Sequence, residues 1–387
     1  MNSQYDAVIV GAGIVGQALA LGLAQAGHSV AVVDKQMAPD VNQNDAFSAR
    51  VSAISAASES LLTSLGAWQH IQRKQAYRGM QVWDHNGFGN IEFTAQEMNA
   101  DHLGHIVEND QVNHALYKQC QTYSSIQHYF EQHITHMQSD DQCAELKLES
   151  SKVLRTKLLI GADGAHSLVR KAFAFKHTYW DYDHTAIVAN VRTEHEHGNI
   201  AKQAFTPFGP LAFLPLAEPN TMSIVFSQQS TKASDLLNLS EREFEKALQV
   251  AIDNHFGKVS LLTPRTGIPL TMRYARQWTS KHVAVVGDAA HTIHPLAGQG
   301  ANLGLADAEA LLRLIKQQPE LLGETKQLRQ YERWRKAEAI KVIATMEGFK
   351  QLFDGDNAFK KLVRNIGLQT ANKVSPLKQF FIQQASS

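Results

Sequence analysis

One stretch of the chain places a carboxylate and several glycines between an apolar run and a helical pattern. Residues 283–286 favour a buried strand, Gly287 and Asp288 follow them, and residues 303–312 have the pattern of a helix. Backbone N–H groups at the start of a helix suit an anionic or electron-rich ligand, and glycine leaves them accessible. The segment ending at Asn302 therefore predicts a binding site for such a ligand.

A glycine-rich turn near the N-terminus predicts a nucleotide site. Gly11, Gly13 and Gly16 lie between the apolar strand pattern of residues 5–10 and a helical pattern. Gly11 is expected to make the tight turn, Gly13 to let the backbone approach a pyrophosphate, and Gly16 to let the helix pack on the strand. Asp34 follows a second strand pattern, 18 positions beyond the third glycine, where it would accept hydrogen bonds from a ribose. An acidic residue there favours FAD or NAD over NADP.

A third apolar run, residues 158–160, also ends in a turn. Asp163 and Gly164 stand in that turn, and a helical pattern that carries Arg170 comes next. The carboxyl ends of strands in an open α/β sheet converge on one crevice, so these three loops predict one large nucleotide ligand. We interpret the ligand as FAD, with its reactive ring at residues 287–302.

Two polar residues in the first third of the chain have open interpretations. Arg50 lies just ahead of a helical pattern at residues 58–65, where a fixed cation could meet a pyrophosphate or could form a surface salt bridge. Asn109 and Asp110 precede another helical pattern, and capping that helix is the simplest role for either.

Composition excludes several classes of protein. The 37 basic and 37 acidic residues of this 387-residue chain balance, so no electrostatic footprint favours nucleic acid. The two cysteines have no metal-ligand spacing, and we expect no metal site and a reducing, cytoplasmic compartment. No apolar run approaches 18 residues, which predicts a soluble protein that is at most peripheral on the inner membrane.

The order of patterns predicts an α/β fold with α+β elements. Strand patterns without intervening helices at residues 180–270 indicate an antiparallel sheet, and the segment 77–105 is expected to join it. We expect a discontinuous, Rossmann-like FAD-binding domain, an interleaved substrate-binding sheet domain and a C-terminal helical tail. Their expected bounds are 1–75, 106–175 and 276–335 for the first, 76–105 and 176–275 for the second, and 336–387 for the third.

The motifs resemble those of class A flavoprotein aromatic hydroxylases of the para-hydroxybenzoate hydroxylase type, over essentially the whole chain. Within that class the chain is most similar to the ring hydroxylases of ubiquinone biosynthesis. The segments that carry this similarity are residues 50–54, 102–109, 180–182 and 291–300. Residues 211–216 and 273–277 resemble the UbiI (VisC) branch, which hydroxylates 2-polyprenylphenol at ring carbon 5.

The resemblance implies an FAD-dependent monooxygenase that hydroxylates a polyprenylphenol in ubiquinone biosynthesis through a flavin C4a-hydroperoxide. NAD(P)H would be a transient reductant, because the chain has no second glycine-rich nucleotide motif, and O2 would be the co-substrate. Two alternatives stay open. The chain could act on another phenol or quinone precursor, or it could be a flavin-binding scaffold of the biosynthetic complex.

The resemblance also implies roles for residues along the cofactor. Arg50 would meet the FAD pyrophosphate, and Asp163 would lie near it. Asn109 would lie near the ribityl chain, Asp288 would bind a ribityl hydroxyl, and Arg170 would help to dock the reductant.

The implied catalytic positions follow Asp288. Pro295 would lie close to the isoalloxazine ring and to the site of reaction with oxygen. The amides of Ala301 and Asn302 would face the N1–C2=O2 edge and stabilise negative charge on the reduced ring. Further cofactor positions implied by these motifs are Gly164, Gly287, Gly298, Gln299 and Gly300.

The C-terminal residues 350–387 carry six basic side chains against two acidic ones. Phe359, Leu362, Val363 and Ile366 fall at helical spacing, which predicts an amphipathic basic helix. Such a helix could bind a membrane surface, dock other ubiquinone-biosynthesis proteins or pack on its own domain. A homo-oligomer is also possible.

Overall fold

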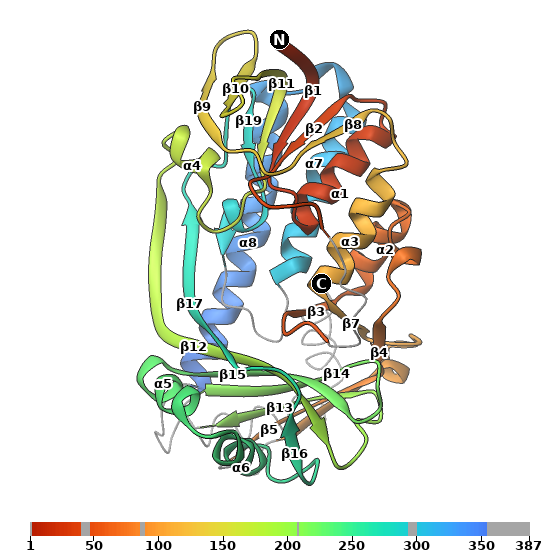
Figure 1. Cartoon of the computed structure of the whole chain (residues 1–387), viewed down its shortest axis with the longest axis vertical. Helices are drawn as coiled ribbons and strands as arrows, with labels where there is room; N and C mark the ends of the chain where they lie inside the picture. Colours follow the sequence, from red (N-terminus) through yellow and green to blue (C-terminus); the bar gives the residue numbers. More distant parts are fainter. Residues whose placement is uncertain (1, 40–46, 86–89, 207–208, 293–299, 354–387) are drawn as a thin grey trace.

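The computed structural model describes residues 2–39, 47–85, 90–206, 209–292 and 300–353. Two large sheets lie at opposite ends of the molecule, and a small third sheet lies between them (Figure 1). Helices pack beside the first sheet, and two short helices lie on the second. This mixed α/β arrangement confirms the predicted fold class.

The first sheet is mostly parallel. Strand β1 (Asn2–Val10) pairs in parallel with β2 (Val30–Val33) on one side and β11 (Val153–Gly161) on the other, and β19 (Val283–Val285) pairs with β11. Residues 7–9 are fully buried, as an unbroken apolar run in a parallel sheet predicts. The other strands of this sheet are β8 (Ile126–Tyr129), β9 (Ile134–Ser139), β10 (Ala144–Leu148) and β18 (Thr279–Ser280).

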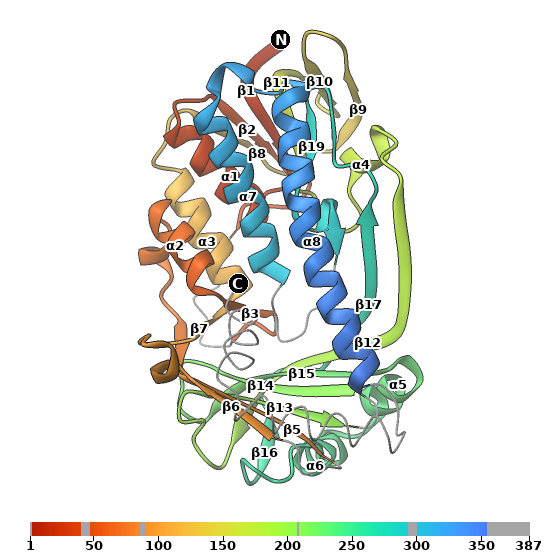
Figure 2. The same cartoon turned by 180° about the vertical axis from the view of Figure 1, so that it is seen from behind.

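Long helices lie side by side against the first sheet (Figure 2). They are α1 (Ile14–Gln25), α3 (Asn109–Cys120), α7 (Gly300–Gln317) and α8 (Thr325–Phe353). A β-carbon on Gly22 of α1 would lie 2.3 Å from Cδ1 of Leu312 on α7. The lack of a side chain at Gly22 therefore sets how closely these two helices approach.

The second sheet is almost entirely antiparallel. Its long strands β12 (His177–Thr193) and β17 (Thr266–Ala275) extend from the first sheet to the second (Figure 1). The short strand β20 (His291–Thr292) pairs with β17 and so joins the loop after β19 to this sheet. The remaining strands are β5 (Gly79–Asp84), β6 (Asn90–Thr94), β13 (Ile200–Thr206), β14 (Gly209–Pro215), β15 (Thr221–Gln229) and β16 (Val259–Leu261). Strands β5 and β13 form its one parallel pair among the described residues.

Helices α5 (Ser230–Asn238) and α6 (Glu241–Ala251) cover one face of the second sheet. Ser240 begins α6 with a capping box, because its side chain accepts from the Glu243 N–H and the Glu243 carboxylate accepts from the Ser240 N–H. Phe244 of α6 is fully buried, and its ring packs in the same core cluster as Phe213 of β14.

The third sheet joins the two halves. It consists of β3 (Val51–Ile54), β7 (Gly104–Glu108) and β4 (Lys74–Tyr77), in that order. Short elements complete the described structure: α2 (Ala56–Ser64), α4 (Leu168–Ala172), and the 3-10 turns η1 (Trp68–His70), η2 (Ala95–Met98), η3 (Gly287–Ala289) and η4 (Pro319–Leu321).

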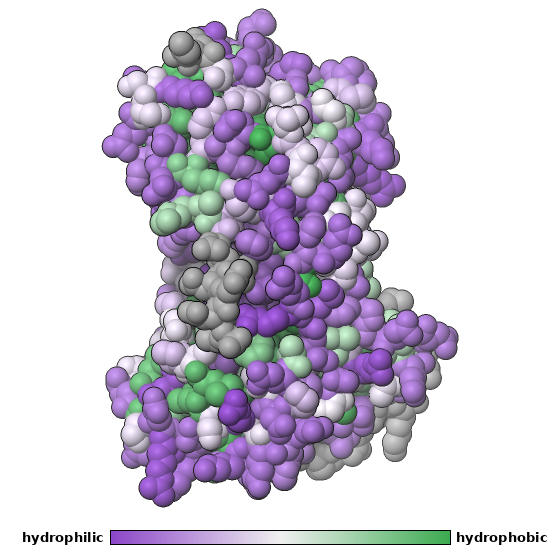
Figure 3. Space-filling model, turned by 45° about the vertical axis from the view of Figure 1, so that its right-hand side comes forward, coloured by the Kyte–Doolittle hydropathy of each residue, from purple (hydrophilic) through white to green (hydrophobic). Residues whose placement is uncertain are grey.

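The two large sheets favour the expected division into an FAD-binding and a substrate-binding domain, which we retain as a proposal. Helix α8 runs without a break past residue 336, so we propose that the C-terminal tail begins within a continuous helix. The amphipathic pattern at 359–366 lies outside the described residues. Among the helices that the structure describes, none is both long and apolar enough to cross a membrane. Hydrophilic side chains predominate on the face in Figure 3, and the hydrophobic ones form small, separate patches.

Candidate active site

The turn between β1 and α1 has the backbone geometry that its three glycines predict. Gly11 adopts φ +106°, and a β-carbon there would lie 2.4 Å from the carbonyl oxygen of Ala162. A β-carbon on Gly16 would lie 1.9 Å from the Gly11 oxygen, so α1 packs directly on the end of β1. Gly13 instead faces open space, with no atom within 4 Å of a β-carbon position. That position leaves room for a ligand to approach the backbone.

Asp34 holds this turn in place. Its Oδ2 atom accepts a hydrogen bond of 2.6 Å from the Ala12 N–H, and Oδ1 accepts one of 2.9 Å from Gln36. A carboxylate has about four acceptor positions, so lone pairs stay free for ribose hydroxyls. The expected ribose contact stays a prediction, to which the structure adds a positioning role.

A cavity of about 660 Å³ lies beside the same turn. Gly13, Asp34 and Asn113 contribute to its lining. The Oδ1 atom of Asn113 is buried and has no hydrogen-bond partner among the described residues. Since buried polar atoms are almost always paired, this oxygen favours a ligand donor in the cavity. The cavity is within the usual size range for a cofactor site.

Asp163 organises the second loop. Its Oδ2 atom accepts from the backbone N–H groups of Leu168 at 2.6 Å and Val169 at 3.2 Å, at the start of α4. Burial raises the pKa of Asp163, although the hydrogen bonds that it accepts act in the opposite direction. Its Oδ1 atom is buried without a partner in the described part of the chain. Asp163 therefore stabilises the loop with one oxygen and keeps the other for a ligand.

Arg170 braces this loop against the third motif. Its side chain is buried and donates from Nη1 to the Ala289 carbonyl at 2.7 Å and from Nη2 to the Ala165 carbonyl at 2.6 Å. These bonds give the Arg170 guanidinium a structural role that does not require a ligand. The implied contact with a reductant stays a prediction.

The third motif forms a tight turn after β19. Gly287 adopts φ +56°, and Asp288 next to it is solvent-accessible. The surrounding protein raises the pKa of Asp288, whereas His291, Arg50 and Arg273 act to lower it. Two cationic side chains from separate elements thus act on the carboxylate that is expected to bind the ribityl chain.

A fully buried carboxylate, Asp307 on α7, holds this turn from behind. Its Oδ2 atom accepts from the Gly287 N–H at 2.9 Å and lies 2.6 Å from Nε2 of His291. Its Oδ1 atom accepts from Nε of Arg335 on α8 at 2.6 Å. Burial alone would raise the pKa of Asp307, but the pKa is lowered because His291 and Arg335 together outweigh burial. The ionised Asp307 therefore ties the turn to both α7 and α8.

Motif spacing does not identify Asp307 and Arg335, which are far apart in sequence. One feature of the sequence could have identified Asp307. Asp307 occupies the same helical face as Gly304, Leu311 and Leu314, all of which are buried. A carboxylate on an apolar helix face requires a buried partner.

The first turn of α7 contains the two backbone amides that are expected to face the flavin ring. N–H groups in the first turn of a helix have no acceptor within that helix, and Ala301 and Asn302 are the second and third residues of α7. The Asn302 side chain is buried and bonds the chain just before α2, accepting from Ser55 N and donating to Ala53 O. The side chain thereby fixes the turn, while the amide roles of Ala301 and Asn302 stay predictions. Pro295, Gly298 and Gln299 lie outside the described residues.

Arg50 and Asn109 meet at the start of α3. The Asn109 N–H donates to the Arg50 carbonyl at 3.0 Å, and the Ser52 hydroxyl donates to Asn109 Oδ1 at 2.6 Å. Capping of α3 by Asn109 or Asp110 is wrong, because the helix begins at Asn109 and Glu108 is its N-cap. Arg50 is exposed and forms no ion pair with any described carboxylate, which favours a ligand role over a salt bridge.

The structure places the carboxyl ends of β1, β11 and β19 next to one another at the same end of the first sheet. The Ala162 N–H donates to the Val10 carbonyl, and the Val286 N–H donates to the Gly161 carbonyl. Arg170 then joins the second loop to the third, as described above. One elongated ligand can therefore contact all three loops.

Comparison with known proteins agrees with this geometry. Residues 4–345 match the family described as FAD binding domain. The chain is 35% identical to 3-demethoxyubiquinol 3-hydroxylase of Escherichia coli, over 99% of each chain. This chain belongs to the FAD-dependent aromatic hydroxylases of ubiquinone biosynthesis.

A further relative of this hydroxylase is also named for ubiquinone biosynthesis, and two solved structures have a similar fold. It is 33% identical to the mitochondrial ubiquinone biosynthesis monooxygenase COQ6 of Danio rerio, over all of this chain and 90% of the relative. The p-nitrophenol 4-monooxygenase PnpA of Pseudomonas putida superposes with a TM-score of 0.81 at 17% identity, over 100% of this chain and 99% of PnpA. PqsL of Pseudomonas aeruginosa gives 0.80 at 20% identity, over 95% and 100%. At these identities the two structures show the fold alone.

FAD fits the residues of this hydroxylase. The backbone at Gly13 is accessible to a ligand, which suits a pyrophosphate. The buried side-chain oxygens of Asn113 and Asp163 have no hydrogen-bond partner among the described residues, so they can accept from a ligand. The amides of Ala301 and Asn302 suit the electron-rich edge of the ring. FAD is the cofactor, and NAD(P)H and O2 are consistent with this class of enzyme.

Proposed function

We propose that this hydroxylase adds a hydroxyl group to ring carbon 5 of a polyprenylphenol in ubiquinone biosynthesis. The observation that carries the proposal is full-length similarity to ubiquinone-biosynthesis hydroxylases, combined with a crevice whose three loops fit FAD. The choice of ring carbon 5 rests on the resemblance of residues 211–216 and 273–277 to the branch with that activity. Both segments belong to the second sheet or its edge, which is where a substrate would be held.

Bound FAD supplies the redox chemistry, since it accepts electrons from NAD(P)H and activates O2 for transfer of one oxygen atom to the ring. The protein binds and orients the cofactor and the substrate. In this proposal Arg50 neutralises the pyrophosphate, Asp288 fixes the ribityl chain, and the amides of Ala301 and Asn302 stabilise negative charge on the ring. Pro295 is proposed to border the site of reaction with O2.

The pairing of β20 with β17 supports a substrate position between the two sheets. His291 and Thr292 pair with Tyr274 and Arg273, so the cofactor turn and the substrate sheet share a backbone ladder. A phenol held on the second sheet would therefore keep a fixed position relative to the turn that carries Asp288. Shared backbone of this kind holds reacting groups within the narrow tolerance that catalysis requires.

The direct test is an assay of purified, FAD-loaded protein with a short-chain 2-prenylphenol. We expect the phenol to accelerate NAD(P)H oxidation and to yield a product hydroxylated at carbon 5, identified by mass spectrometry and NMR. Parallel assays with NADH and NADPH determine the reductant. An unchanged phenol, with NAD(P)H oxidised only to produce peroxide, would contradict the proposed substrate.

A second candidate is hydroxylation of a demethoxyquinol. The name of the E. coli relative, 35% identical over 99% of each chain, favours it. The same assay with a short-chain demethoxyubiquinol separates the two candidates, because each predicts a different substrate and product. In a deletion strain, accumulation of polyprenylphenol supports the first candidate, and accumulation of the demethoxy intermediate supports the second.

A scaffold role without catalysis is the remaining alternative. The variant Asp288→Ala, which we expect to bind FAD poorly, tests it by complementation of the deletion strain. Full recovery of quinone synthesis by a variant without FAD would favour the scaffold. No recovery, with the protein present at normal abundance, supports the enzyme.

We further propose that residues 350–387 bind an anionic membrane surface or another protein of the pathway, because they carry an excess of basic side chains. Deletion of this segment is expected to reduce pelleting with vesicles that contain anionic lipid. Equal pelleting of both forms would contradict membrane binding. Analytical ultracentrifugation of the same samples measures whether the protein forms a homo-oligomer.

A further inference from the structure

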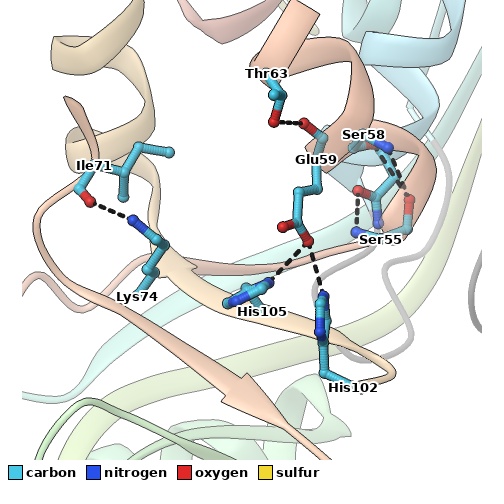
Figure 4. A network of polar contacts seen from close by, with 9 residues as sticks. Ser55, Ser58, Glu59, Thr63, Ile71, Lys74, His102 and His105 are labelled. Atoms are coloured by element: carbon cyan, nitrogen blue, oxygen red, sulfur yellow. Dashed lines mark hydrogen bonds and ion pairs between the residues drawn. The ribbon is translucent and has the colours of Figure 1, made fainter. Parts of the chain in front are cut away.

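Glu59 lies beside two histidines that are 43 and 46 residues further along the chain, and none of the three has a role in the proposed flavin site (Figure 4). Glu59 lies on α2, His102 precedes β7, and His105 lies on β7. Nε2 of His102 and Nδ1 of His105 each lie 3.0 Å from the same oxygen of Glu59, Oε2. Their three possible ligand atoms lie within 4.8 Å of one another.

The backbone around the cluster holds these side chains in place. His105 pairs with Ile54 on β3 and with Ala76 on β4, so β7 is fixed on both edges. A β-carbon on Gly104 would lie 2.6 Å from the Ile54 carbonyl, so only glycine allows this close approach. The His105 ring also packs against the Trp68 ring at 5.0 Å and the His102 ring at 4.4 Å. These contacts reduce the reorganisation that binding an ion would require.

Two imidazole nitrogens and one carboxylate oxygen form a donor set that suits a divalent transition metal such as zinc. Zinc binds such atoms at roughly 2.0–2.2 Å, which sets neighbouring ligand atoms roughly 3.3 Å apart. The two 3.0 Å separations are close to that spacing. The three side chains are between 12% and 26% exposed, so an ion can enter and a water molecule can complete its coordination. We propose that Glu59, His102 and His105 bind one zinc-like divalent ion.

The ion would stabilise a series of hydrogen bonds that leads from α2 to the start of α7. Glu59 lies in the first turn of α2, where its N–H donates to the Ser55 carbonyl. The Ser55 N–H in turn bonds the side chain of Asn302 at the start of α7. Occupancy would therefore stabilise the segment that positions α7. The inference does not depend on which phenol or quinol the enzyme hydroxylates.

Sequence spacing gives no indication of this site. Glu59 is 43 residues from His102, and the two histidines are not on a helix, so their three-residue spacing has no helical meaning. The prediction that the chain has no metal site did not consider this set of one carboxylate and two histidines. Only the antiparallel pairing of β3 with β7 brings the two segments together.

The test is titration of the full-length, FAD-loaded protein with Zn²⁺, followed by calorimetry. We expect one ion per chain, with an affinity that falls more than tenfold in His102→Asn and Glu59→Gln. The matched control is His70→Asn, another partly exposed histidine, which hydrogen-bonds the neutral side chain of Gln119 and should bind Zn²⁺ like the wild type. Absence of binding in the wild type, or equal binding in all four proteins, would overturn the proposal.

A second measurement decides the question if the variants lose FAD or fail to fold. Zinc-edge X-ray absorption of the wild-type holoenzyme is expected to show two imidazole nitrogens at about 2.0–2.1 Å. A shell with fewer than two imidazoles would contradict the assignment. Chelation should also lower the melting temperature of the zinc-loaded wild type but leave that of the His102→Asn variant unchanged.

Discussion

At the scale of single residues, we expect high sensitivity to substitution at a carboxylate with no implied contact to the cofactor. Asp307 is fully buried between a histidine and an arginine and also accepts the Gly287 N–H. Removing one member of a buried ionic network leaves the others unpaired, which costs more than the network contributes when intact. The ion pairs behind the cofactor turn are therefore expected to outweigh surface ion pairs in their effect on stability.

We predict that Asp307→Asn lowers the free energy of unfolding by about 3–5 kcal/mol, because Arg335 loses its buried counter-charge and His291 loses a charged hydrogen-bond partner. Urea unfolding of the FAD-loaded protein measures the change. The control is Glu309→Gln, an exposed carboxylate on the same helix, expected to change stability by less than about 0.5 kcal/mol. Equal effects of the two substitutions would contradict the proposed role.

The buried residue His128 is expected to make the stability of the folded protein depend on pH. His128 lies on β8 with Nε2 3.0 Å from Gln17 Oε1, and burial lowers its pKa from 6.5 to about 4. The folded state keeps the ring neutral, whereas the unfolded chain takes up a proton below pH 6.5. Stability should therefore fall as the pH decreases from 6.5 towards 4.

Substitution His128→Gln removes this titration and should flatten that part of the stability curve. Urea midpoints between pH 7 and 4 measure it, with exposed His136→Gln on β9 as the control. A variant that keeps the wild-type slope would show that another group causes it.

Residues whose roles depend on local backbone were predictable, and residues joined only by tertiary contacts were not. Gly11, Gly13 and Gly16 follow from spacing because the turn between one strand and one helix fixes their geometry. Arg335 on α8 reaches Asp307 on α7, and Glu59 on helix α2 reaches His105 on strand β7. No local pattern in the sequence indicates that these residues lie close together in the fold.

At the scale of elements, the contact of α1 with α7 positions two of the three cofactor loops. Helix α1 begins at the glycine turn, and α7 begins at the amides expected to face the ring. A β-carbon at Gly22 would lie 2.3 Å from Leu312 Cδ1, and the Leu312 side chain is only partly buried. This contact, together with that of Gly304 on α7 with Val15 on α1, helps to set the separation of the helices and of their N-termini.

We predict that Gly22→Ala destabilises the protein by about 1–3 kcal/mol, because the added methyl group forces Leu312 or α7 to move. Combining it with Leu312→Ala should recover part of the loss, since the clashing atoms are then absent. A double-mutant cycle of unfolding free energies measures this coupling. Strict additivity of the two single changes would exclude a direct clash.

Element types were predictable from apolar periodicity, whereas pairing across the chain was not. The strand patterns at 5–10, 158–160 and 283–286 correspond to neighbouring strands of one sheet, as convergence of their loops requires. The pairing of β20 with β17 could not be predicted, because a two-residue strand has no detectable alternation. That pairing nevertheless joins the cofactor turn to the second sheet.

At the scale of the whole molecule, α8 connects the C-terminal region to strand β19, next to the edge of the first sheet. The Tyr331 hydroxyl donates to the Val285 carbonyl of β19 at 3.2 Å, and Arg335 bonds Asp307. Both contacts occur within the first eleven residues of a 29-residue helix. These two contacts with the cofactor turn and its sheet therefore come from the first part of α8.

This arrangement predicts opposite results for two truncations. A chain ending at residue 353 should keep bound FAD and a melting temperature close to that of the full chain, because all contacts of α8 with β19 and α7 remain. A chain ending at residue 330 lacks Tyr331 and Arg335 and leaves Asp307 without its arginine, so it should lose FAD and unfold at a lower temperature. Flavin absorbance after gel filtration and thermal unfolding measure both outcomes. If the chain ending at 353 also loses FAD, residues 354–387 must contribute to the cofactor site itself, and the proposal that they serve only membrane or partner binding would be wrong.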